Sequence, residues 1–145
     1  MENIYNKILV GLDGSAESLK AFDRAITVAK LNNAELILVN VIELRSFQAI
    51  NIYDSVSEKN HEDGAKILLE QFADEAKQAG VKQVTTLLEY GSPRVMMATK
   101  IPKKLGIDLI IVGATGMSYL ERIVIGSTTS YIIAHSSCDT LIVRR

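Results

Sequence analysis

Four short runs of this sequence are almost entirely apolar, and they constrain the fold more than any other feature. They lie at residues 7–12, 35–41, 109–112 and 140–143. A half-exposed strand alternates apolar and polar side chains, whereas a strand buried on both faces reads as a continuous apolar run. A fifth run, at residues 84–89, is rich in β-forming side chains. The sequence therefore predicts a five-stranded sheet that is covered on both faces.

Helical patterns separate these runs. Their expected bounds are residues 15–31, 57–79, 92–101 and a last helix after Gly126. Ser15 and Ser92 are the expected N-caps, and Pro102 should end or kink the third helix. Because strands alternate with helices, we expect residues 1–145 to form one α/β domain. Its core is an open parallel five-stranded sheet with helices on both faces.

The segment from Ile42 to Val56 has no clean period and is expected to be a long loop. A long loop in a compact domain is often a functional lid or an interaction surface. A partly helical connection that only covers the edge of the sheet fits the same residues.

Composition excludes several classes of protein. The net charge is −1, from 16 basic and 17 acidic side chains, so there is no basic footprint for nucleic acid or for an anionic membrane. The single cysteine, Cys138, excludes an internal disulfide and a cysteine metal cluster. The first residues do not resemble a signal peptide, and no apolar run is long enough for a membrane span. We therefore expect a cytoplasmic protein.

The stretch from Asp108 to Thr129 carries the clearest functional signal. An apolar strand ends at Gly113, Gly116 follows, and Gly126 opens a helical pattern. Glycines let a backbone come close to a ligand, and the free N–H groups of a helix start point at an anion. The hydroxyls of Ser127, Thr128 and Thr129 add donors there. The spacing alone also fits glycines that only shape a loop. Neither the P-loop motif GxxxxGK[ST] nor the dinucleotide-binding motif GxGxxG occurs.

The spacing G-x2-G-x9-G-S, which starts at Gly113, resembles the nucleotide-binding motif of the universal stress protein family, in its ATP-binding branch. The resemblance extends over the whole chain. It implies a Rossmann-like fold of the nucleotide α-hydrolase type, with ATP as ligand and Mg²⁺ held through the phosphates. It also implies a homodimer built by the C-terminal strand Leu141–Val143. The chain departs from the family at Cys138-Asp139-Thr140, where a proline usually precedes the last strand.

By this resemblance Asp13 lies by the adenosine, Val41 faces the adenine, and the glycines and hydroxyls of the motif hold the ribose and phosphates. The implied cofactor-binding residues, together with a cation inside the nine-residue spacing, are Leu12, Asp13, Val41, Val112, Gly113, Gly116, Arg122, Gly126, Ser127 and Thr128.

Each of these positions also has a simpler interpretation. Asp13 fits a turn and cap residue, Val41 fits plain core, and Arg122 fits a solvated charge paired with Glu121. For Gly126 the expectation is that a side chain would fill the phosphate volume or penalise a positive φ.

Three functions remain open on the sequence. The first is an ATP-binding sensor or stress-response module with little or no intrinsic catalysis. The second is an enzyme on the same fold, an adenylating ATP pyrophosphatase or a slow ATPase. An ATP pyrophosphatase needs an SGGxDS loop after the first strand, and residues 11–15 read GLDGS. The third is a protein-interaction domain with an empty site. No catalytic residue and no dedicated metal site is expected, because His61 and His135 lie far apart in the sequence.

Overall fold

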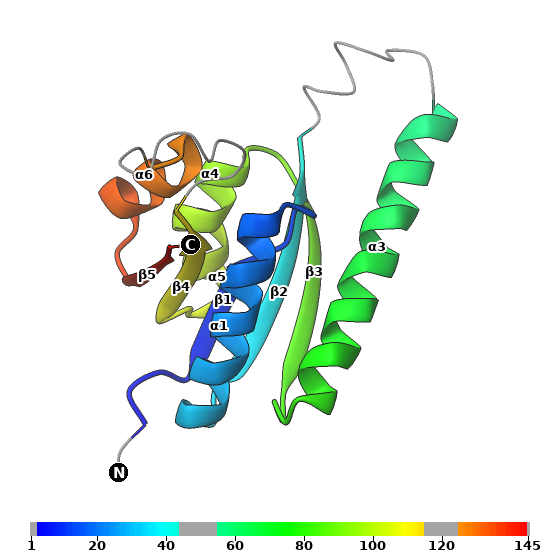
Figure 1. The fold of residues 1–145 in the computed structure, drawn as a ribbon. Helices are drawn as coiled ribbons and strands as arrows, with labels where there is room; N and C mark the ends of the chain where they lie inside the picture. Colours follow the sequence, from blue (N-terminus) through cyan, green and yellow to red (C-terminus); the bar gives the residue numbers. More distant parts are fainter. Residues whose placement is uncertain (1–2, 44–54, 115–124, 145) are drawn as a thin grey trace.

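The strands of the protein form one parallel sheet in the order β3-β2-β1-β4-β5 (Figure 1). The structure, a computed structural model, describes residues 3–43, 55–114 and 125–144. The strands are β1 (Lys7–Gly11), β2 (Glu35–Ile42), β3 (Val84–Tyr90), β4 (Leu109–Gly113) and β5 (Asp139–Val143). The predicted five-stranded parallel sheet is confirmed, and each strand lies within one residue of its predicted bounds.

Helices cover both faces of the sheet, as predicted. The helical segments are α1 (Ala16–Asn32), α3 (Ser55–Gln78), α4 (Pro93–Val95), the π-helical turn η1 (Met96–Lys100), α5 (Ile101–Leu105) and α6 (Ser127–His135). Side chains of α1 and α3 belong to one buried cluster with the strands, and side chains of η1, α5 and α6 belong to a second. Figure 1 shows α1 in front of the sheet and α5 behind it.

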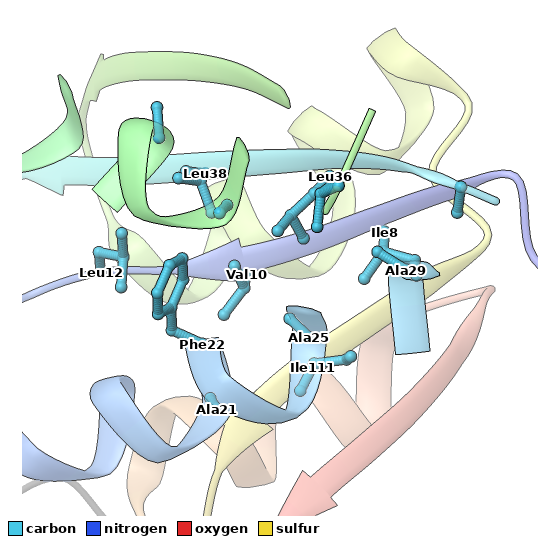
Figure 2. Packing of buried hydrophobic residues seen from close by; sticks show 14 of the residues in the cluster. Ile8, Val10, Leu12, Ala21, Phe22, Ala25, Ala29, Leu36, Leu38 and Ile111 are labelled. Atoms are coloured by element: carbon cyan, nitrogen blue, oxygen red, sulfur yellow. The ribbon is translucent and has the colours of Figure 1, made fainter. Parts of the chain in front are cut away.

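The first cluster packs α1 and α3 onto the centre of the sheet. Phe22 of α1 reaches toward Val10 and Leu12 at the end of β1 (Figure 2). Its ring also meets Phe72 of α3 edge to face, with the ring centroids 4.9 Å apart and the planes at 72°. Aromatic pairs prefer this arrangement because the positive edge of one ring faces the negative face of the other.

Pro102 does not end its helix, and that part of its prediction is wrong. The helical path runs on through α5 to Leu105 and stops at Gly106, which has a φ of +70°. Proline has no N–H for an i→i−4 bond, and its ring crowds the preceding turn. Directly before it, Ile101 N–H bonds to the carbonyl of Met96, five residues back. The perturbation therefore takes the form of a π-helical turn.

The long loop predicted for residues 42–56 cannot be compared in full, because residues 44–54 lie outside the described part of the chain. Its last two residues are helical, since α3 begins at Ser55. Within the described residues, no helix has the length and apolar character needed to span a membrane.

The strand order places a reversal beside β1. The chain runs outward from β1 to β2 and β3, and it then crosses back to place β4 on the other side of β1. The register pairs Val10 with Ile111, so the carboxyl ends of β1 and β4 lie next to each other. Open α/β sheets bind ligands in the crevice beyond the carboxyl ends of the strands at such a reversal.

At the opposite side of the sheet, the amino edge formed by the first residues of the strands, the protein's own side chains supply hydrogen-bond partners. The Asp108 carboxylate accepts hydrogen bonds from the backbone N–H groups of Asn6 and Lys7, at 2.8 and 3.1 Å. The Tyr5 hydroxyl donates to Asp139 at 2.8 Å, and this bond raises the pKa of Tyr5. The amino edge therefore uses carboxylates to satisfy its own backbone and side-chain donors.

Candidate functional site

The turn after β1 is built by Asp13, Gly14 and Ser15. One Asp13 carboxylate oxygen accepts a hydrogen bond from Ser15 N–H at 2.9 Å, and Gly14 has a φ of +85°. The Ser15 hydroxyl oxygen accepts from Ser18 N–H at 3.1 Å, so Ser15 is the N-cap of α1 as predicted. The turn role of Asp13 is confirmed. Its carboxylate is nevertheless exposed at the carboxyl edge, and its contact with adenosine stays a prediction.

The two strands that flank β1 contribute apolar side chains at this edge. Val41 near the end of β2 and Val112 near the end of β4 are half-buried and pack on the same cluster, on the α6 face of the sheet. Leu12 differs, because its side chain is only 2% exposed and lies in the cluster on the opposite face. Its backbone faces the edge, where Asn40 Nδ2 donates to the Leu12 carbonyl at 2.7 Å. The Leu12 N–H also donates to the Val39 carbonyl at 2.8 Å, so Leu12 can offer a ligand neither its side chain nor its N–H.

Gly113 ends β4 against the first turn of α1. A Cβ added at Gly113 would lie 2.9 Å from both the Cβ and the carbonyl oxygen of Glu17, which is itself only 8% exposed. A backbone atom at that distance cannot swing away, so a side chain at this position would force the helix and strand apart. The sequence explained Gly113 by close approach to a ligand. The structure adds an independent reason, which is the packing of β4 on α1.

The start of α6 lies beside the end of β4. Gly126 is the N-cap of α6, and its N–H donates to the Ala114 carbonyl at 2.8 Å. Its φ is −59° and its ψ is 157°, which is the extended backbone of an N-cap. Of the two reasons expected for a glycine here, the structure excludes the positive φ, and the filling of phosphate volume by a side chain stays a prediction. The first bond along the helix runs from Ser130 N–H to the Gly126 carbonyl at 2.9 Å. The N–H groups of Ser127, Thr128 and Thr129 precede it and have no intrahelical acceptor.

Three hydroxyls were expected to add donors at this helix start, and they differ in exposure. Ser127 is exposed and Thr128 is half-buried. Thr129 is only 5% exposed, and its hydroxyl donates to the Gly113 carbonyl at 2.8 Å. The Thr129 hydroxyl therefore uses its proton in a hydrogen bond within the protein. Sequence reasoning could not assign this role, because nothing in the local sequence shows which of three adjacent hydroxyls faces inward.

Taken together, the ends of β1, β2 and β4 and the start of α6 converge at the reversal. Gly116 and Arg122 lie outside the described residues, and their predicted contacts stay predictions. In residues 3–43, 55–114 and 125–144 no three His, Cys, Asp or Glu side chains form a metal-binding group. The convergence offers N–H donors for an anion, an exposed carboxylate as acceptor for hydroxyls, and two half-buried valines as an apolar wall.

Comparisons with known proteins agree on one family. A sequence model of the universal stress protein family matches residues 4–144. A relative in Staphylococcus haemolyticus that carries the universal stress protein name is 39% identical over 140 residues, covering 97% of this chain and 85% of the relative. The solved structure of protein MJ0577 superposes with a TM-score of 0.85 at 28% identity, covering 98% of this chain and 97% of the other.

A second solved structure bears on the ligand. It is a universal stress protein in complex with cAMP, with a TM-score of 0.71 and 27% identity, and the match covers 97% of each chain.

The contact between Gly113 and Glu17 predicts a stability effect that needs no ligand. Gly113→Ala should lower the free energy of unfolding by about 1–3 kcal/mol, the usual cost of overpacking. The matched control is Gly64→Ala, because Gly64 lies in α3 and a Cβ there meets nothing within 4 Å. That variant should raise the free energy by about 0.5–1 kcal/mol. Urea unfolding without nucleotide measures both, and parent-like stability of Gly113→Ala would contradict the packing role.

Proposed function

This chain belongs to the universal stress protein family, and on that premise we propose that it is an ATP-binding module. In this proposal ATP binds at the carboxyl edge of the sheet with Mg²⁺, and the bound nucleotide sets the conformation or the partners of a stress-response sensor. Mg²⁺ arrives with the nucleotide and is held by phosphates and water. No described feature favours the alternative of an adenylating enzyme, and residues 11–15 do not match its loop.

One observation carries the proposal, and it is the contrast between two helix starts at the reversal. The start of α1 is capped by the protein itself, because the Ser15 hydroxyl accepts from Ser18 N–H. The start of α6 has Gly126 as its N-cap, which has no side chain to supply a cap. Helix starts attract anions through their free N–H groups and the helix dipole. A phosphate group would complete at α6 what Ser15 completes at α1.

The remaining groups suit the nucleoside. Asp13 offers an exposed carboxylate that can accept hydrogen bonds from ribose hydroxyls. Val41 of β2 and Val112 of β4 lie on the same face of the sheet, on either side of β1, and would give an apolar wall for an adenine ring. Small-molecule sites commonly combine such an apolar wall with a few polar groups that fix orientation.

Cyclic AMP is the second candidate ligand, because a relative of similar fold was solved in complex with it. It shares the adenine and ribose with ATP but has one phosphate and no chain of phosphates. If the start of α6 binds a phosphate chain, ATP should bind more tightly than cAMP and adenosine. If only the nucleoside is recognised, the affinities should be similar.

Calorimetric titration with ATP, cAMP and adenosine in the presence of Mg²⁺ tests the site. Ser127→Ala should weaken ATP binding by about ten- to a hundredfold, since a hydrogen bond to a charged group contributes about 1.5–3 kcal/mol. Gly126→Val should weaken ATP binding further, because its side chain would fill the phosphate volume. The variant should still fold, because valine can adopt the φ of −59° found at Gly126. Ala134→Val, on the exposed last turn of α6, is the control and should bind as the parent does.

Two results would count against the proposal. If the parent binds none of the three ligands at millimolar concentration, the chain is not a nucleotide-binding module under these conditions and the interaction-domain alternative replaces it. If Gly126→Val folds and binds ATP as tightly as the parent, the start of α6 does not hold the phosphates.

We also propose that β5 pairs with its counterpart in a second copy of the chain. The Val143 carbonyl accepts from Ala114 N–H, so it faces β4. Backbone groups of successive strand residues point to opposite sides, and those of Thr140 and Ile142 therefore face away from β4. An edge strand with such outward groups is a template for pairing with another chain. Pairing of two β5 strands would give a two-fold, isologous interface.

A pair of proline variants tests this assembly. Thr140→Pro removes an outward N–H from β5 and leaves the ladder to β4 intact, because proline is tolerated at such edge positions. Thr86→Pro is the control, since Gly91 N–H bonds to the Ile42 carbonyl and alternation then turns Thr86 outward on the other edge strand, β3. Sedimentation velocity at micromolar concentration should show a dimer for the parent and Thr86→Pro and a monomer for Thr140→Pro. A monomeric parent, or a dimeric Thr140→Pro, would rule out the β5 interface.

A further inference from the structure

Thr129 connects the start of α6 to the end of β4 through its side chain. It is the third residue of α6, it is 5% exposed, and its hydroxyl donates to the Gly113 carbonyl at 2.8 Å. The two residues are 16 positions apart in the sequence, so the bond joins separate elements and is not part of the helix. A buried hydroxyl that already donates to a carbonyl is not free to donate to a ligand.

The backbone around this bond is held from several directions. Ala114 N–H donates to the Val143 carbonyl at 3.0 Å, and Gly126 N–H donates to the Ala114 carbonyl at 2.8 Å. On its other side Gly113 lies against Glu17 of α1, with no room for even one added carbon. The backbone at the end of β4 is therefore firmly held, and the Thr129 hydroxyl connects the first turn of α6 to it by a hydrogen bond.

We infer that Thr129 is a positioning residue of the phosphate site, acting through its hydrogen bond to Gly113 rather than by touching the ligand. The inference rests on the proposed function. The direction of the Ser127 and Thr128 N–H groups is set by the orientation of the first turn of α6. The hydrogen bonds of Gly126 and Thr129 hold that turn against the end of β4. Ile132 anchors the middle of α6 in the core, so loss of the hydroxyl leaves its first turn with only the Gly126 backbone bond, among the described hydrogen bonds, to the end of β4, and that turn can tilt. Because hydrogen bonds weaken steeply with misalignment, a tilt costs phosphate contacts first.

A purely structural role for the hydroxyl predicts a different pattern. The Gly113 carbonyl would lose its donor, the protein would be less stable, and every ligand would be affected to the same extent. A positioning role instead concentrates the loss on ligands that carry a phosphate chain. Adenosine, which would contact Asp13, Val41 and Val112 on the turn and strands and not the first turn of α6, should not sense the tilt of α6.

Two variants separate these outcomes. Thr129→Val keeps the shape of the side chain and removes the hydroxyl, while Thr129→Ser keeps the hydroxyl and removes a methyl group. Calorimetry with ATP and Mg²⁺ should show a loss of about three- to tenfold for Thr129→Val, which is the range of one neutral hydrogen bond. Its affinity for adenosine should stay within about twofold of the parent, a change too small to count as a lost hydrogen bond. Thr129→Ser should restore the ATP affinity to the same margin.

Three results would overturn the inference while leaving the proposed function standing: ATP binding by Thr129→Val as tight as the parent's, an equal loss for ATP and adenosine, or a failure of Thr129→Ser to restore binding. A parent protein that binds no nucleotide fails the proposed function itself. If Thr129→Val does not fold, Thr129→Ala replaces it, because alanine also lacks the hydroxyl and has the highest helix propensity.

Discussion

The structure depends on the burial of β1 from every side. Its residues Ile8, Leu9 and Val10 are fully buried, with one cluster on each face and a parallel neighbour at each edge. A central parallel strand can gain its second neighbour only if the chain leaves on one side and returns on the other. The reversal beside β1 is therefore a consequence of this burial. The adjacency of the carboxyl ends of β1 and β4, the usual place for a ligand in such a sheet, follows from the same constraint.

What distinguishes the two edges of the sheet is the way their backbone groups are satisfied. At the amino edge, Asp108 accepts the N–H groups of Asn6 and Lys7. At the carboxyl edge, the start of α1 is satisfied by Ser15, whereas the start of α6 has a glycine at the capping position. The polarity of parallel strands and right-handed crossovers brings helix starts to this edge. Neither α6 nor the three-residue α4 has a side-chain hydrogen bond at its N-cap, but only α6 has an N-cap residue, Gly126, that has no side chain to supply one.

Much of the fold could be read from the sequence because its signals are local. Continuous apolar runs identify strands that are buried on both faces, and Ser15 and Ser92 identify helix starts. The course of the chain around Pro102 could not be read. A proline in a helical pattern predicts an end or a kink, and the local sequence does not show that a π-helical turn with Met96 and Ile101 buried in the core takes its place.

The candidate site was predictable in outline and less so in its parts. The order of glycines and hydroxyls marks the end of β4 and the start of α6. It does not show that Gly113 is required by the backbone of Glu17, nor that Thr129 turns inward to the Gly113 carbonyl. Both facts arise from contacts between segments that are distant in the sequence, so the local sequence pattern cannot predict them. At Gly126 the sequence left two reasons for a glycine open, and the φ of −59° excludes only the positive-φ reason.

The central claim is that ATP binds at the carboxyl edge with its phosphates on the first turn of α6. Amide chemical shifts of the labelled protein, titrated with ATP and Mg²⁺, test it most directly. The account predicts saturable shifts at Ser127 and Thr128 and at Asp13 on the turn after β1. The amides of Asn6 and Lys7, which Asp108 already holds at the amino edge, should not move. Saturable shifts centred on the amino edge, or none anywhere at millimolar ATP, would contradict it.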